Sequence, residues 1–97
     1  MLVALMRLDL RIPGAHSLKQ KRHVVKSLIA AVRSKFNVSV AEVDHQDLWH
    51  RTTLAVAATG AESYHVRSVM QRVERFVEAW GEVEVIGADL TVHDPED

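Results

Sequence analysis

A segment near the N-terminus, HSLKQKRHVVKSL, combines a helix-start signal with a concentration of positive charge. Ser17 followed three residues later by Gln20 is the capping-box pattern, in which the two side chains cap free backbone N–H groups of a helix. The first turns nevertheless carry Lys19, Lys21 and Arg22, although the helix dipole disfavours cations there by roughly 0.3–1 kcal/mol each. Two explanations are open: an anion binds here, or acidic residues elsewhere in the fold pair with these cations.

The cations of this predicted helix gather on one side. Lys19, Arg22, Lys26 and Arg33 share an arc of about 60°, whereas Lys21 points in the direction of the apolar stripe. Such a flank, about 20 Å long, could follow a nucleic-acid backbone, and the helix start could hold a phosphate. A solvated face paired with acidic residues is the alternative. The predicted phosphate-binding residues are Lys19, Lys21, Arg22, Lys26 and Arg33, with Arg7 and Arg11 extending the surface.

The charge along the chain is strongly asymmetric. Residues 1–35 contain eight Lys or Arg and one acid, Asp9, a net charge of +7. The remainder contains the other four basic residues and twelve acids, a net charge of −8. The basic part could face a polyanion, or the two parts could neutralise each other within the fold or across a dimer.

Other kinds of site find little support. The segment around His45, Asp47 and His50 offers metal-ligating side chains without a defined scaffold, so polar turn residues are the preferred interpretation and no metal is predicted. The chain has no cysteine, its serines stand in no activating motif, and its four glycines are scattered. The segment PGAHSLKQKR stands where acylphosphatases of similar fold bind phosphate, but it lacks their glycine-rich, Arg-bearing loop. We therefore expect no enzyme and no cofactor, with a small phosphate-handling enzyme as a third hypothesis.

Six elements must position these residues. Alternating apolar positions predict strands, and apolar stripes at helical spacing predict helices. In the last strand we expect Ile86, Ala88, Leu90 and Val92 to face the core. The predicted elements are a strand over 1–12, a helix over 18–36, strands over 37–43 and 51–59, a helix over 63–80 and a strand over 82–93.

The order β-α-β-β-α-β predicts an α+β fold, the ferredoxin-like sandwich: a four-stranded antiparallel sheet with both helices on one face. One domain should cover residues 1–93, followed by a short acidic tail over 94–97. The other face of the sheet would expose Val3, Leu5 and several alanines, which favours a homodimer through that face over a solvated surface. Its central strands carry no aromatic residue to stack bases, so any bound RNA should be duplex or structured.

Three segments together are characteristic of one family: HSLKQKRHVVKSL, KFNVSVAEVDHQDLWHRTTLAVA and the helical segment with VMQRVERFVE. On these segments nearly the whole chain resembles the YlxP-like family of small bacterial proteins of unknown function. The resemblance implies a ferredoxin-like fold and, because members are often encoded beside translation and ribosome-maturation genes, an association with the ribosome or RNA. It implies no catalytic residue. The motif emphasises Ser17, Leu18, Lys19, Lys21, Arg22, Glu42, Asp47 and Trp49.

The leading hypothesis is a non-enzymatic accessory protein that binds structured RNA or a ribosomal particle through the basic helix. The alternative is a dimeric interaction or regulatory module without nucleic acid, whose basic helix pairs with acidic partner surfaces. The opening MLVALM is too short and too soon interrupted by Arg7 to be a signal peptide or membrane span, so we expect a cytoplasmic protein without a membrane partner. No small-molecule substrate is predicted.

Overall fold

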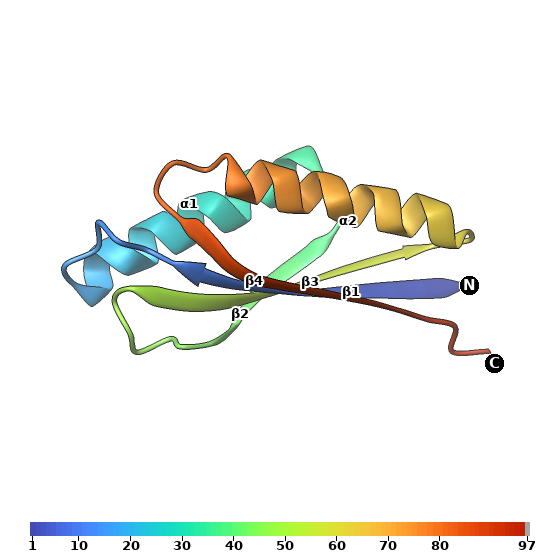
Figure 1. Cartoon of the computed structure of the whole chain (residues 1–97), viewed down its shortest axis with the longest axis horizontal. Coiled ribbons are helices and arrows are strands. Elements are labelled where there is room, and N and C mark those ends of the chain that lie inside the picture. The colour runs from blue at the N-terminus through green and yellow to red at the C-terminus, as the bar shows by residue number, and fades with distance from the viewer. Residues whose placement is uncertain (97) are drawn as a thin grey trace.

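The computed structural model describes residues 1–96, and Asp97, the last residue of the predicted tail, lies outside them. Figure 1 shows six elements in the predicted order, which confirms the β-α-β-β-α-β arrangement. Neither helix in the described part is long and apolar enough to cross a membrane. The elements are β1 (Leu2–Arg11), α1 (Leu18–Lys35), β2 (Ser39–Asp44), β3 (Arg51–Gly60), α2 (Ser63–Glu78) and β4 (Glu84–His93).

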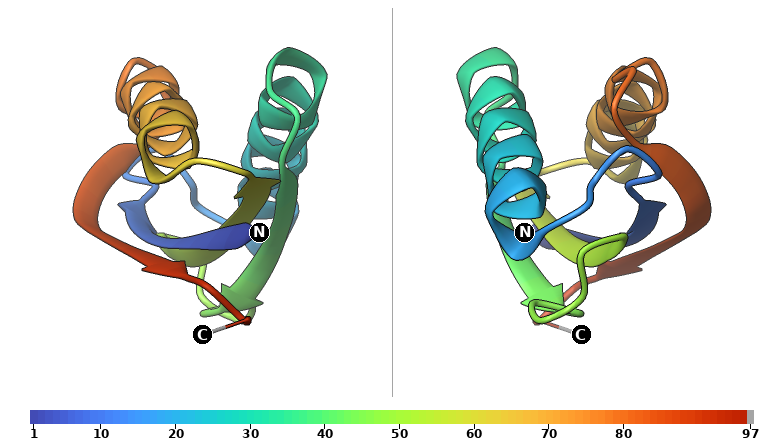
Figure 2. Two further views of the ribbon diagram at one scale, coloured as in Figure 1. Left: turned by 90° about the vertical axis from the view of Figure 1, so that its right-hand side faces the viewer. Right: turned by 90° about the vertical axis from the view of Figure 1, so that its left-hand side faces the viewer.

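The four strands form one antiparallel sheet in the order β2-β3-β1-β4, so β1 and β3 are central. Both helices cover the same face of this sheet, and no helix within residues 1–96 covers the other face (Figure 2). This is the ferredoxin-like sandwich that the sequence predicts. We call the face without helices the open face.

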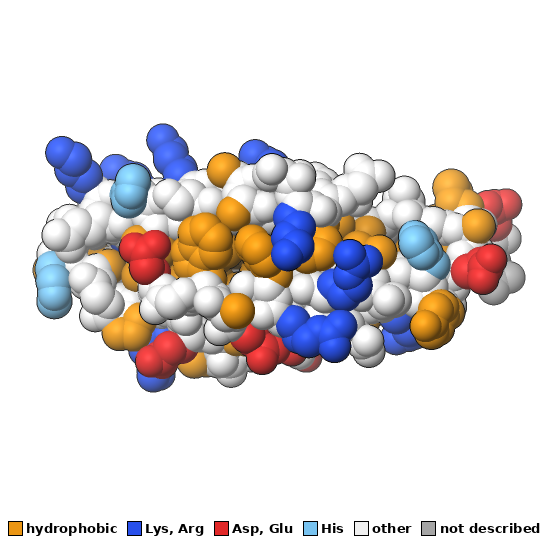
Figure 3. Space-filling view, turned by 90° about the horizontal axis from the view of Figure 1, so that it is seen from above, with side chains coloured by type: hydrophobic (Ala, Val, Ile, Leu, Met, Phe, Trp, Pro, Cys, Tyr) orange, Lys and Arg blue, Asp and Glu red, His pale blue; other side chains and the backbone are white. Residues whose placement is uncertain are grey.

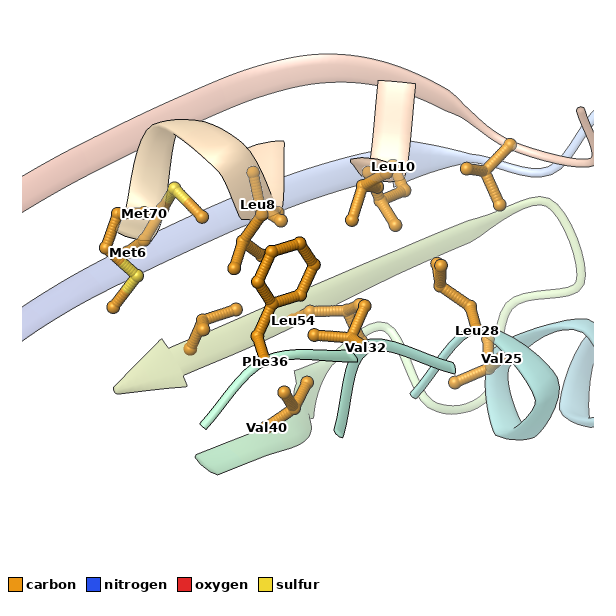
Figure 4. Close-up of a cluster of buried hydrophobic side chains, with 14 of the residues drawn as sticks. Met6, Leu8, Leu10, Val25, Leu28, Val32, Phe36, Val40, Leu54 and Met70 are labelled. Atoms are coloured by element: carbon orange, nitrogen blue, oxygen red, sulfur yellow. The ribbon is translucent and has the colours of Figure 1, made fainter. Parts of the chain in front are cut away.

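The core lies between the sheet and the helices because each element presents one apolar side there. On β1 the alternate residues Met6, Leu8 and Leu10 are buried, as a period of two requires. Leu28 of α1 and Met70 of α2 belong to the same buried cluster, and Figure 4 shows Met70 beside Met6. Ridges of Val, Leu and Met at helical spacing on both helices therefore fix which flank of each helix faces solvent.

The structure corrects the predicted orientation of β4. A β-bulge shifts the register between Asp9 and Leu10 of β1, so that Leu10 pairs with Val85. Val85 therefore packs against the core, whereas Ile86 falls in the bulge and is 43% exposed. Beyond the bulge the prediction holds, since Leu90 pairs with the buried Met6. A bulge adds one residue to one strand and reverses the facing of the residues before it.

Candidate functional site

The start of α1 is capped as the sequence predicts, with one difference in detail. Ser17 is the N-cap, and its Oγ accepts a hydrogen bond from the backbone N–H of Gln20 at 3.1 Å. In the standard capping box the Gln20 side chain would accept a hydrogen bond from the backbone N–H of Ser17. Here its Oε1 accepts instead from the backbone N–H of His16, one residue earlier, at 2.7 Å. The first turn contains no acidic residue, so its local charge is positive.

Lys21 is the one predicted phosphate-binding residue of α1 that the structure removes from the surface. Its side chain is 0% exposed, and its Nζ lies 2.8 Å from Oε2 of Glu42. The same ammonium donates to the backbone carbonyls of His45 at 2.8 Å and Gln46 at 3.2 Å. With its donors directed inward, Lys21 cannot contact a phosphate outside, and its assignment as a phosphate ligand is wrong.

Lys21 instead forms a clamp that joins α1 to Glu42 of β2 and to the turn that follows this strand. Glu42 also accepts a hydrogen bond from the hydroxyl of the buried Thr52 at 2.6 Å. The clamped turn contains His45, whose φ of 61° is uncommon for a residue other than glycine. The pairing of a cation with a distant acid, one of the two explanations for the charged helix start, therefore holds for Lys21.

The predicted phosphate-binding cations of α1 other than Lys21 point outward, and for them the explanation that an anion binds remains open. Lys19, Arg22 and Lys26 are exposed, and none of the carboxylates in residues 1–96 forms an ion pair with them. Arg33 is exposed too, but its guanidinium donates to the carbonyl of Val40 on the edge strand β2. We call Lys19, Arg22, Lys26 and Arg33 the basic flank.

The flank lies on the outer side of α1, as the bond from Arg33 to β2 indicates. Figure 3, a view onto the helix layer, shows Lys and Arg side chains projecting along one long edge of the molecule. Their charge is not neutralised within the part of the chain that the structure describes. The flank is therefore free to attract an anionic partner.

Arg7 and Arg11 do not extend the basic flank, contrary to the prediction. Both alternate with buried residues of β1 and so lie on the open face, across the sheet from the helices. Arg7 Nε lies 3.4 Å from Oδ2 of Asp9, and Arg11 Nη1 lies 3.5 Å from Oε2 of Glu84. Asp9 also accepts from the Thr53 hydroxyl at 2.8 Å, and this bond, followed by the Arg7 side chain, lowers the pKa of Asp9.

The metal-ligating side chains of the turn after β2 do not form a site. His45, Asp47 and His50 lie close in sequence, but no group of three or more His, Asp or Glu arranged to hold a metal occurs among residues 1–96. Asp44, next to them, accepts a hydrogen bond from the backbone N–H of His45 at 2.8 Å. These residues shape the turn that Lys21 clamps.

A groove that the sequence did not predict runs beside the start of α1. Its volume is about 900 Å³, and it lies between the loop before α1 and the loop after α2. Lys19 and His23 line one side and Glu82 the other. Sequence reasoning missed this groove because Gly81 and Glu82 come from a loop about 60 residues further along the chain.

The fold and the flank together define a small α+β protein with a capped, basic first helix. Residues 3–90 match the family model described as "Protein of unknown function (DUF503)", and the chain belongs to this family. It is 40% identical over 70 residues to the uncharacterized protein YlxP of Bacillus subtilis (strain 168), covering 72% of this chain and 76% of that protein. Lys21 and Glu42, two residues of the motif that carried the resemblance, are the two ends of the buried ion pair.

A solved structure with a similar fold is a de novo designed protein, Foldit4. The match covers 95% of this chain and 97% of the designed one, with a TM-score of 0.53 and 10% identity. At that identity the likeness concerns the fold alone.

Proposed function

We propose that the chain is a non-enzymatic accessory protein that binds structured RNA or a ribosomal particle in the cytoplasm through the basic flank of α1. The observation that carries the proposal is that Lys19, Arg22 and Lys26 project from one side of α1 without acidic partners in residues 1–96. Unpaired cations spaced along a rigid helix provide contacts to successive phosphates.

The kind of RNA follows from what surrounds the flank. The central strands β1 and β3 contain no aromatic side chain, so the sheet offers no surface on which exposed bases could stack. Phosphates of a duplex or folded RNA are then the main contacts. The groove beside Lys19 and His23 gives an RNA backbone room to approach the start of α1.

The test is RNA binding by fluorescence anisotropy with labelled, structured ribosomal RNA fragments. The test variant is Lys19→Gln/Arg22→Gln/Lys26→Gln, which removes three charges but keeps long side chains with good helix propensity. The matched control is a triple Arg→Gln variant that removes three exposed charges from α2. Its positions are Arg67, Arg72 and Arg75.

We expect the α1 variant to lose at least about 100-fold in affinity at low salt, since counterion release by three phosphate contacts is lost. The α2 variant should lose much less. Equal losses in the two variants would show that net charge alone governs binding, and wild-type affinity in the α1 variant would exclude the flank as the contact. If RNA binds weakly throughout and an acidic protein surface binds instead, the chain is a protein-interaction module.

A further inference from the structure

The open face of the sheet is a defined pattern of side chains. On this face, residues of the two central strands lie side by side in pairs. The pairs of β3 and β1 residues are Thr59 with Val3, Ala57 with Leu5 and Ala55 with Arg7. On the outer strands, Ser39 pairs with Ala57 and Ala41 with Ala55, while Thr91 pairs with Leu5 and Asp89 with Arg7. The centre of the face is thus small and apolar.

The centre of the open face is hollow over the alanines of β2 and β3 and raised at Leu5 of β1. A depression of about 370 Å³ lies over the alanines, bounded by Leu5 and Arg7 on one side. Leu5 is 45% exposed, a large exposure for a leucine at the middle of a sheet. Side chains on β1 are therefore long where their neighbours on β3 are short.

The charges of the open face nearly balance one another. By register, three positive charges lie on it, from Arg7, Arg11 and Arg51, and four negative ones, from Asp9, Asp44, Glu84 and Asp89. Arg7 and Arg11 already pair within the chain. A nearly neutral face without aromatic residues gives a nucleic acid neither electrostatic attraction nor stacking, whereas a second copy of the same face can cover it with little net repulsion.

We propose that a second copy of this chain covers the open face, related by a two-fold axis that runs parallel to the strands between β1 and β3. This axis places β1 of each copy over β3 of the other. Leu5 of the second copy then fills the depression over Ala55 and Ala57, and the reverse contact follows from symmetry. An axis perpendicular to the strands would set β1 against β1, long side chains against long, and is disfavoured.

The size of the face reaches the lower limit for a biological dimer interface. Strands of ten residues are about 33 Å long, and four strands at about 4.8 Å spacing give a sheet roughly 19 Å wide. Because β2 is shorter, roughly 500–600 Å² of each copy would be covered, or about 1,000–1,200 Å² in total. A biological interface should clear about 1,000 Å² in total, and specific, stable interfaces typically bury about 1,200–2,000 Å². The product would be a four-layered assembly with the helices, and hence both basic flanks, on the outside.

Sedimentation equilibrium tests this arrangement, with the wild type expected at twice the chain mass of 10.9 kDa. Leu5→Lys should raise the dissociation constant about 100-fold or more, because symmetry buries two unpaired ammonium groups in an apolar contact. Ile86→Lys is the matched control, since Ile86 is 43% exposed but lies at the β4 bulge beside Glu74 and Glu78. It should leave the dimer intact.

Folding is checked by circular dichroism, and Ala57→Lys decides the question if the Leu5 variant does not fold. A wild type that remains at 10.9 kDa at several hundred micromolar overturns the proposal, as does a dimer that persists in Leu5→Lys and in Ala57→Lys. The triple Gln variant of α1 should dimerise normally, and high salt should not dissociate the dimer. Failure of RNA binding and failure of dimerisation are therefore separate results.

Discussion

The Lys21 clamp leads to a stability prediction that can be worked out from its contacts. Lys21→Met keeps the apolar stem but removes the ammonium, which lies 2.8 Å from Glu42 Oε2 and 2.8 Å from the His45 carbonyl oxygen. Removing one partner of a buried ion pair typically costs about 3–5 kcal/mol. Because Glu42 is 20% exposed and keeps its bond from Thr52, we expect the lower end of that range.

A loss of about 3 kcal/mol in the free energy of unfolding corresponds to a fall of about 12–24 °C in Tm for a domain of this size. Urea unfolding followed by tryptophan fluorescence and circular dichroism measures it. Lys26→Met is the control, because Lys26 is on the same helix but exposed, and it should change stability by less than about 0.5 kcal/mol. Glu42→Gln should also destabilise, since it leaves the Lys21 ammonium buried without a counter-ion.

Combining Lys21→Met with Glu42→Gln should cost less than the two single losses added together, because the double variant buries no unpaired charge. At a temperature where Lys21→Met is folded, its RNA affinity should equal that of the wild type, since Lys21 is not a surface residue. The reasoning is refuted if Lys21→Met loses no more stability than Lys26→Met, or if the losses of Lys21→Met and Glu42→Gln are additive.

Three further perturbations test the packing and electrostatics. Because the pKa of Asp9 is lowered in the folded protein, ionised Asp9 stabilises the fold at pH values above its ordinary pKa of 3.8, and this contribution is lost as the pH falls further. Asp9→Asn should therefore make the urea midpoint less sensitive to acid. Burial and the neighbouring Glu78 raise the pKa of Glu74, so ionised Glu74 destabilises the fold at pH 7. Glu74→Gln should raise the urea midpoint at pH 7 and give no gain in stability below pH 4.5, the ordinary pKa of the group. An unchanged urea midpoint at pH 7 would contradict this prediction. Gly60→Ala would bring a Cβ within 2.7 Å of Val66 Cγ1 and should cost about 1–3 kcal/mol in urea unfolding, and a neutral effect would mean that α2 can shift freely.

Local periodicity was sufficient to predict the architecture. The alternation along β1 and the apolar stripe of α1 are strong enough to place each element, and short antiparallel connections leave few topologies. The Ser17 cap was likewise visible in the sequence, since it depends on residues three positions apart.

Features that depend on strand register and on the burial of a side chain could not be predicted from local sequence patterns. The bulge opposite Asp9 moves Val85 into the core and Ile86 out of it, and no local signal marks where the extra residue falls. The helical wheel did place Lys21 towards the apolar stripe. Its partner Glu42 lies 21 residues away on another element, so the pairing appears only once helix and hairpin are packed together.

The central claim, that the outward cations of α1 contact RNA phosphates, is tested most directly by the salt dependence of RNA binding. The slope of log K against log salt should become shallower by about 2–3 units in Lys19→Gln/Arg22→Gln/Lys26→Gln, since each phosphate contact contributes about 0.7–0.9. The α2 triple variant, with the same loss of charge, should keep the wild-type slope. An unchanged slope in the α1 variant would contradict the claim, because it would mean that the basic flank releases no counterions on binding.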